Sequence, residues 1–231
     1  MHFLHVFFEL CNMNYTSVQQ LIVSNTRIIR ILLCIFFSVG ISGFIYPPTS
    51  LLLISLIPYV LVGNFIMLIL FDESQISYKQ YLVFSVIFLV GLGIEIIGVS
   101  TKAIFGNYSY GNSLGVKVFD TPLLIGMNWL FLIYTTRLVF QNFKMNEIFK
   151  ILGASTTMIV YDYFLEHSAH KMDMWYWEHN IIPLQNYISW FIVSVALHSL
   201  VSYSKLIIKN KIANTILIIQ SVFFIILYFG L

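Results

Sequence analysis

The sequence predicts an all-α fold: a polytopic membrane bundle of about seven transmembrane helices with a cytoplasmic N-terminus. The first observation is composition, because 59% of the 231 residues are hydrophobic, only 10% are charged, and the mean hydropathy is +0.87. Soluble globular domains carry about 25% charged residues, so most of this chain is expected to lie in lipid. The second observation is a series of long apolar runs, and the third is the uneven placement of Lys and Arg between them.

Seven runs have the length of about 20 mostly apolar residues that a membrane-crossing helix needs. They are Ile28–Tyr46, Ser50–Phe71, Tyr81–Ser100, Thr121–Phe140, Ile148–His167, Ile181–Tyr203 and Ile212–Leu231. A Pro-Pro-Thr segment alone separates the first two, which predicts a tight connection between antiparallel helices. No repeat or linker interrupts the series, so residues 1–231 are expected to form one transmembrane domain, with residues 1–27 as an N-terminal extension.

The basic residues fall mainly in one set of alternate connections. Nine of the twelve belong to that set: Arg27, Arg30, Lys79, Arg137, Lys144, Lys150, Lys205, Lys209 and Lys211. Cytoplasmic loops carry an excess of Lys and Arg, so these connections are expected to face the cytoplasm. The protein is expected to cross the inner (cytoplasmic) membrane of the cell several times. The net charge is only +2, and Lys and Arg are neither numerous nor gathered into one patch. This argues against a nucleic-acid partner.

Polar side chains inside the predicted spans gather toward the opposite, non-cytoplasmic end. Glu95 lies near the end of the third span, Asp162 and Glu166 near the end of the fifth, Asn128 within the fourth, and Asn186 opens the sixth. An ionisable side chain at the bilayer centre costs about 2.5–3.5 kcal/mol on insertion scales. We therefore expect these five residues to share one chamber and to satisfy one another.

Aromatic residues surround this predicted chamber. Those expected to lie around it are Phe105, Tyr108, Tyr110, Trp129, Tyr161, Trp175, Trp177, Tyr187 and Trp190, with residues 105–110 as a candidate aromatic lid. Helical spacing places Asp162 and Glu166 on one face, and Gly91 and Gly98 would let a neighbouring helix approach Glu95 closely. A carboxyl among aromatic rings favours its protonated form, and ring faces attract cations. The pattern is typical of a site that protonates an apolar substrate, although an interfacial aromatic belt explains any single Trp or Tyr equally well.

Several classes of protein fit poorly. His167, His170 and His179 share one predicted loop, without the repeated histidine boxes on other helices that a membrane di-iron site needs. The sequence therefore predicts no metal site. A retinal-binding seven-helix protein needs a lysine in its last span, and residues 212–231 contain none.

Two blocks of the sequence carry a longer pattern. The block EIIGVSTKAIFGNYSYGNSLGVKVFDTPLLIGMNW supplies Glu95, Gly98, Thr101, Phe105, Gly106, Tyr108, Tyr110, Leu114, Gly115, Pro122, Leu123 and Trp129. The block YDYFLEHSAHKMDMWYWEHNIIPLQNYISWF supplies Asp162, Glu166, Ala169, Trp175, Trp177, Pro183, Asn186 and Trp190. Together they resemble the membrane-integral carotenoid biosynthesis protein family, which includes carotenoid 1,2-hydratases and bisanhydrobacterioruberin hydratases. One departure is His167, which stands where the family pattern has proline.

The resemblance implies an enzyme that hydrates the terminal double bond of an acyclic carotenoid, such as lycopene, gamma-carotene or a C50 relative. Hydration of an alkene is not a redox reaction, so no cofactor is expected. The substrate would lie within the bilayer, with catalytic residues in the segments 91–129 and 161–190. Asp162 or Glu95 would deliver the proton, and the other, aided by Glu166, would orient the water. Asn128 and Asn186 would hold the water or the acid, and the aromatic residues would line the cation site.

Two alternatives remain open at the level of sequence, as does the oligomeric state. A lycopene-cyclase-like enzyme also protonates a terminal alkene, but Gln185 and Asn186 stand where its acidic pair is expected. A transporter or lipid-binding membrane protein could use the same inward carboxylates for proton coupling. It would place polar residues along a path to both faces, whereas this sequence concentrates them at one.

Overall fold

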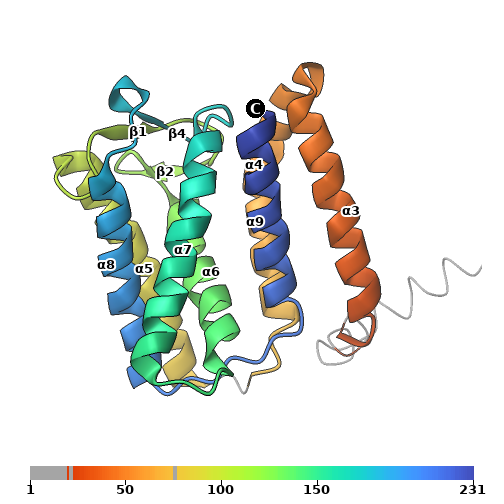
Figure 1. Cartoon of the computed structure of the whole chain (residues 1–231), viewed down its shortest axis with the longest axis vertical. Coiled ribbons are helices and arrows are strands. Elements are labelled where there is room, and N and C mark those ends of the chain that lie inside the picture. Colours follow the sequence, from red (N-terminus) through yellow and green to blue (C-terminus); the bar gives the residue numbers. More distant parts are fainter. Residues whose placement is uncertain (1–19, 21–22, 75–76) are drawn as a thin grey trace, which may run out of the picture.

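The computed structural model describes residues 20, 23–74 and 77–231, and this part of the chain is a helical bundle (Figure 1). Its long helices are α3 (Thr26–Ile45), α4 (Pro47–Leu70), α5 (Tyr78–Thr101), α6 (Leu123–Gln141), α7 (Glu147–Ala169), α8 (Leu184–Tyr203) and α9 (Ala213–Gly230). All seven are long and apolar enough to cross a membrane. The predicted all-α membrane bundle is confirmed, while most of the predicted extension, residues 1–19, 21 and 22, lies outside the described residues.

The helix boundaries differ from the predicted spans mainly at prolines. Pro47 and Pro48 form the first turn of α4 and are not a connection between helices. Proline fits this position because the backbone N–H groups of the first helical turn have no acceptor within the helix, so the N–H that proline lacks is not needed there. Pro122 and Pro183 directly precede α6 and α8, so both helices begin two or three residues later than predicted.

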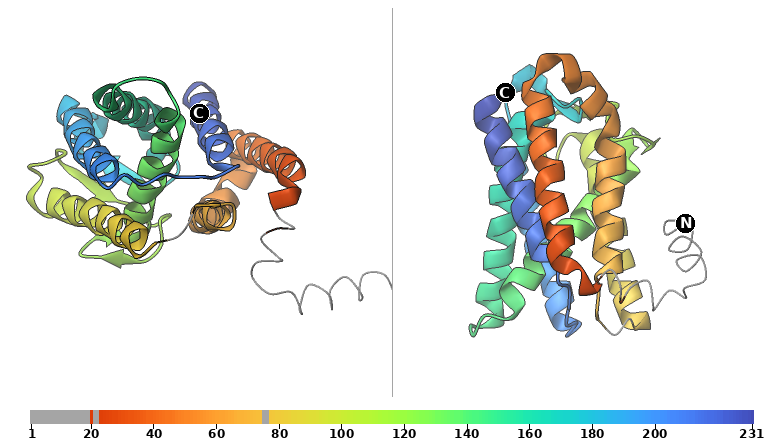
Figure 2. Two further views of the ribbon diagram at one scale, coloured as in Figure 1. Left: turned by 90° about the horizontal axis from the view of Figure 1, so that it is seen from below. Right: turned by 90° about the vertical axis from the view of Figure 1, so that its right-hand side faces the viewer.

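The helices form two groups that lie side by side in Figures 1 and 2. One group is α5–α8; the other is α3, α4 and α9, and α9 packs against α3 as well as against α6 and α7. Helix α6 is the most enclosed: 67% of an apolar 18-residue stretch of this helix is buried, whereas the share for α3 is 11%. The first group therefore holds a protein-lined interior, and α3 presents most of its apolar surface to lipid.

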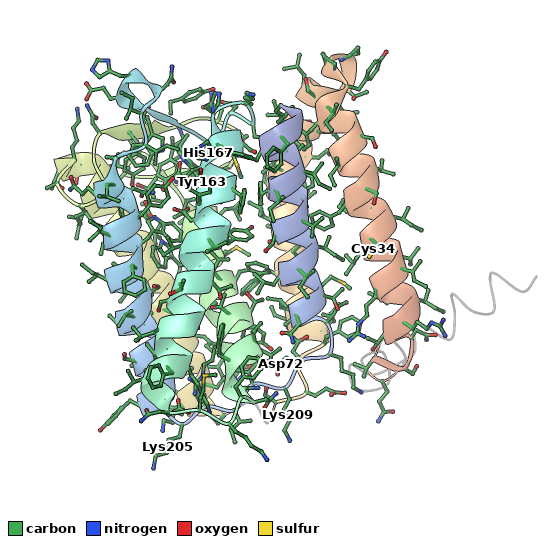
Figure 3. The ribbon with its side chains drawn as sticks, in the orientation of Figure 1. Cys34, Asp72, Tyr163, His167, Lys205 and Lys209 are labelled. Carbon is green, nitrogen blue, oxygen red and sulfur yellow. The ribbon has the colours of Figure 1, made fainter. Side chains whose placement is uncertain are left out.

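The two ends of the bundle differ in structure. One end carries two short antiparallel sheets, β1 (Tyr108–Tyr110) with β4 (Trp175–Trp177) and β2 (Lys117–Val118) with β3 (Thr121–Pro122), and the 3-10 helix η1 (Glu178–Asn180). We call it the sheet end. The opposite end, called the basic end, carries Lys205 and Lys209, and Figure 3 shows them far from His167 at the sheet end. The basic end is the one that the distribution of Lys and Arg assigns to the cytoplasm.

The pairing of β1 with β4 corrects the prediction of a loop at residues 105–110. Tyr108 pairs with Trp177 and Tyr110 with Trp175. Successive side chains of a strand point to opposite faces, so both tryptophans of β4 are buried while Tyr176 between them is 42% exposed. An aromatic residue at every second position, as in β1, is the strand signal that the sequence contained.

Gly91 lets α6 approach α5 beside Glu95, as predicted, whereas Gly98 packs against Phe105 in the segment after α5 and not against a helix. A Cβ atom on Gly91 would lie only 2.5 Å from the Cβ of Trp129, and one on Gly98 would lie 2.6 Å from the ring of Phe105. Any side chain at these two positions would push an aromatic residue away from the carboxylate.

Candidate active site

Three carboxylates are buried toward the sheet end of the α5–α8 group. Glu95 on α5 is 2% exposed, and Asp162 and Glu166 on α7 are 1% and 4% exposed. In the described part of the chain, the ion pairs involve Glu73 and Glu147 but none of these three. A buried carboxylate needs hydrogen-bond donors or a paired charge, so neutral donors must support them.

Glu95 is held by three aromatic side chains. The hydroxyls of Tyr108 and Tyr110 donate to its Oε2 at 2.6 and 2.8 Å, and Nε1–H of Trp129 donates to its Oε1 at 3.1 Å. Two of the donors come from β1 and one from α6. Both oxygens of Glu95 are therefore fixed in place.

The two tyrosines remain donors because they hold their protons. Burial, and then the neighbouring Glu95 carboxylate, raise the pKa of Tyr108 well above its ordinary value. The same two causes, in the same order, raise the pKa of Tyr110. A neutral phenol can donate to a carboxylate, whereas a phenolate would repel it.

Glu166 is held in a similar way from β4 and α8. Nε1–H of Trp175 and of Trp177 donate to its Oε2 at 2.8 and 2.7 Å, and the amide of Asn186 donates to its Oε1 at 3.1 Å. An indole nitrogen only donates, so Oε2 must serve as the acceptor of both bonds.

The β1–β4 ribbon positions Glu95 and Glu166 together. Its strand β1 supplies the tyrosine donors to Glu95, and β4 supplies the tryptophan donors to Glu166. The rings of Tyr108 and Trp177 lie 5.0 Å apart between centroids. The rings of Tyr110 and Trp175 lie 6.1 Å apart, edge to face. A shift in this ribbon would therefore move donors at both carboxylates.

Asp162 has much less hydrogen-bond support than the two glutamates. The amide of Asn186 donates to its Oδ2 at 3.3 Å, and its Oδ1 is buried without a hydrogen-bond partner among the described residues. Asp162 and Glu166 are one helical turn apart, and the same Nδ2 of Asn186 contacts both. Of the three carboxylates, Asp162 is thus the one least equipped to hold a negative charge.

Stacked rings complete the site. Trp129 stacks on Trp190 of α8 with a centroid distance of 4.0 Å and an angle of 20° between the ring planes. Phe105, buried against Gly98, lies edge-on to Tyr108 at 6.2 Å. The structure thus gathers around the carboxylates Phe105, Tyr108, Tyr110, Trp129, Trp175, Trp177, Asn186 and Trp190.

Two predicted residues lie away from the carboxylates: Tyr161, whose hydroxyl donates to Gln220 of α9, and Asn128. Asn128 faces α4 and α9. It lines a small cavity with Asn64 of α4 and Gln220 of α9, whereas its neighbour Trp129 points to Glu95. Successive helical residues are about 100° apart, so the depth of Asn128 in its span does not determine the direction it faces. A role for Gln220 or Asn64 was not predicted, because the only signal that the sequence gives for α4 and α9 is their high hydropathy.

A cavity of about 450 Å³ opens beside Glu166 between α7, α8 and η1. Its lining includes Trp177 and Tyr187, both predicted to lie around the chamber, and also His167 and His170, which were not predicted to line it. Burial, and then Lys171 and His167, lower the pKa of His170, so this side chain adds little positive charge at neutral pH. The cavity gives Glu166 a route to the outside of the bundle.

Metal ligands do not gather at this site. In the part of the chain that the structure describes, no three His, Cys, Asp or Glu side chains are grouped so that they could hold a metal ion.

Seven helices able to cross a membrane, packed around buried carboxylates and aromatic rings, define a multi-pass membrane protein with a buried acidic and aromatic site. A family model described as carotenoid biosynthesis protein matches residues 55–231, so the chain belongs to the carotenoid biosynthesis protein family. The match begins within α4 and includes all three carboxylates and the β1–β4 ribbon. No curated protein and no solved structure matches the chain.

Proposed function

We propose that the protein is a carotenoid hydratase of the cell's cytoplasmic membrane. It adds water across the terminal double bond of an acyclic carotenoid that lies within the bilayer, and it needs no cofactor. The observation that carries this proposal is the pairing of Asp162 with Glu166 through one amide nitrogen of Asn186. Asp162, which accepts one hydrogen bond, thus lies beside Glu166, which accepts three.

Asp162 acts as the acid. It donates its proton to the less substituted carbon of the terminal alkene, and the π electrons form the new C–H bond. The positive charge then falls on the tertiary carbon. General acid catalysis by a positioned carboxyl typically contributes 10²–10⁴-fold to the rate, and the poor support for an Asp162 anion favours proton release to substrate.

Glu166 acts as the base. It accepts a proton from the water that attacks the tertiary cation, so a lone pair of the water oxygen forms the C–O bond of the alcohol. Passage of that proton from Glu166 to Asp162, both of which contact Asn186, restores the starting state. The balance is one alkene plus one water, and no oxidant or reductant is required.

Glu95 and the aromatic rings stabilise the cation. Ring faces attract a positive charge by about 0.5–2 kcal/mol, more when water is excluded, and the stacked rings of Trp129 and Trp190 supply such a surface. Glu95, fixed by its three donors, supplies a negative charge at the same end. The cavity beside Glu166 gives water access, which favours capture of the cation by water over ring closure.

Mass analysis of pigments tests the proposal. Expression of the protein in a lycopene-producing bacterium should give products heavier by one water per modified end. The Asp162→Asn variant, inserted at normal levels, should lose this activity. Its matched control is Asp120→Asn in the exposed turn between β2 and β3, at the same end of the bundle, which should remain active. Products of unchanged mass with a shifted spectrum would show cyclisation and refute the proposal. Full hydration by Asp162→Asn would instead remove Asp162 from the role of acid.

A further inference from the structure

Another cavity, of about 260 Å³, lies within the group of α3, α4 and α9, where this group meets α7. Its walls come mainly from α3, α4 and α9, and α7 contributes Tyr161. The hydroxyl of Tyr161 donates to Oε1 of Gln220 on α9 at 3.1 Å, whereas Asp162 and Glu166 contact Asn186 on α8. Helix α7 thus separates this cavity from the carboxylates.

The size of the cavity indicates a binding site. Protein interiors are close-packed, with few voids larger than a water molecule. An apolar cavity of about 150 Å³ stays free of water and binds benzene, and this one is larger. Water gains little from entering because the lining carries only two polar side chains, Tyr161 and Gln220, which are bonded to each other.

The lining selects a flat, uncharged chain. No charged residue contributes to the cavity, so it offers nothing to a phosphate or an ammonium group. Phe223 meets Phe37 and Phe44 nearly at right angles, with centroid distances of 5.7 and 5.9 Å, and Phe224 meets Tyr161 in the same way at 5.6 Å. Both faces and edges of rings are therefore available to a conjugated chain.

Rigidity distinguishes a polyene from the acyl chain of a lipid. Ordering a flexible chain costs conformational entropy that a rigid ligand does not lose. The cavity also reaches the surface that faces lipid, because Phe36, Val39 and Leu56 line it and are 53%, 65% and 41% exposed. A long rigid molecule in the bilayer can enter here without crossing a polar region.

We propose that this cavity is a second binding site, which holds a segment of a carotenoid polyene against α7. The choice of a carotenoid rests on the proposed function. The evidence that the cavity binds a ligand is independent of that function, because it comes from the lining of the cavity and its exposure to lipid. Bound there, the polyene lies on a different face of α7 from the three carboxylates, about 100° around the helix from Asp162, so the enzyme keeps a carotenoid beside its site.

Filling the cavity tests the inference. A Cβ atom at Gly40 would lie 3.5 Å from Phe223, an ordinary contact, so Gly40→Leu should fold while its side chain occupies the space. Val60→Phe fills the same cavity from α4. The matched control is Gly63→Leu, on α4, where an added Cβ meets no atom within 4 Å.

The measurement uses purified protein in lipid nanodiscs titrated with lycopene. Lycopene is achiral, so a visible circular dichroism signal reports binding in a protein site. We expect Gly40→Leu and Val60→Phe to bind about one lycopene fewer per chain, or about tenfold more weakly, and Gly63→Leu to match the wild type. The Asp162→Asn variant should keep the signal that the cavity gives.

Two results would overturn the inference: equal lycopene binding in wild type and both filled variants, or a cavity occupied by phospholipid that lycopene does not displace. Hydration of pigments is measured in the same preparations. Loss of cavity binding in the filled variants, with no hydration by the wild type, would refute the proposed reaction and leave the second site standing.

Discussion

The two ends of α7 hold a glutamate in opposite ways. At the basic end, Glu147 accepts from Arg137 at 3.0 Å and pairs with Lys150 at 2.9 Å. At the sheet end, Glu166 accepts only from neutral indole and amide groups. A cation fixes the charge of its partner, whereas neutral donors orient a carboxylate and leave it able to accept a proton. The comparison indicates that partners, not residue type, separate a glutamate held as an ion from one that can act as the base of the proposed reaction.

The charge distribution of the sequence explains this difference. Lys and Arg concentrate in the connections at the basic end, so a carboxylate there finds a cation nearby. At the sheet end the connections supply strands of Tyr and Trp. These donate hydrogen bonds without adding charge, and the apolar substrate of the proposed reaction would tolerate them.

The largest expected effect comes from changing each of these two glutamates to glutamine. Glu166→Gln should lower hydration by about 10²–10⁴-fold because it removes the base. Glu147→Gln should lower the thermal stability, since Arg137 is buried and loses its ionic partner, but should leave the activity per folded molecule unchanged. Pigment mass analysis and thermal unfolding in detergent measure the two effects. Equal loss of activity in both variants would contradict the comparison.

The next effect concerns the packing that holds Trp129 against Glu95. Gly91→Ala places a methyl group 2.5 Å from Trp129, and overpacking of this kind typically costs 1–3 kcal/mol. We expect a lower midpoint of thermal unfolding and reduced hydration together. Gly93→Ala, on the same helix, adds its methyl group to open space and should change neither. Wild-type activity in Gly91→Ala would show that the position of Trp129 is unimportant.

A smaller effect should follow from removing one donor and keeping its ring. Trp129→Phe deletes the 3.1 Å hydrogen bond to Glu95 but retains an aromatic surface next to Trp190. A hydrogen bond to a charged group contributes about 1.5–3 kcal/mol, so hydration should fall roughly ten- to a hundredfold. Trp190→Phe keeps all three donors to Glu95 and should cost less. The reverse order would mean that the stacked surface matters more than the donor.

The helices and the depth of the site could be predicted because each depends on local sequence. Apolar runs predict the spans, and the distribution of Lys and Arg predicts which ends lie together. Glu95, Asp162 and Glu166 therefore fall at one end in the structure as they do in the prediction. The glycine beside Glu95 also followed from helical spacing alone.

The sheet and the direction of Asn128 could not be predicted in this way. The β1–β4 ribbon joins Tyr108 to Trp177, which are far apart in the chain. A prediction made for one span at a time cannot detect such a pairing. Asn128 has the predicted depth but faces α4 and α9. Its direction depends on how α6 is rotated within the bundle, and the packing of the other helices determines this rotation.

The smallest expected effect is the titration of the two tyrosines that belong to the sheet end. Burial and then Glu95 raise the pKa of Tyr108 and of Tyr110 in the folded protein. Their stabilising contribution is therefore complete below the unfolded pKa of about 10 and is lost as the pH rises above it. Folded wild type and the double variant Tyr108→Phe/Tyr110→Phe should show the same phenolate absorbance change near pH 10. After denaturation the double variant should show less, by two tyrosines. A smaller change already in the folded variant would mean that these phenols ionise normally and do not act as fixed donors to Glu95.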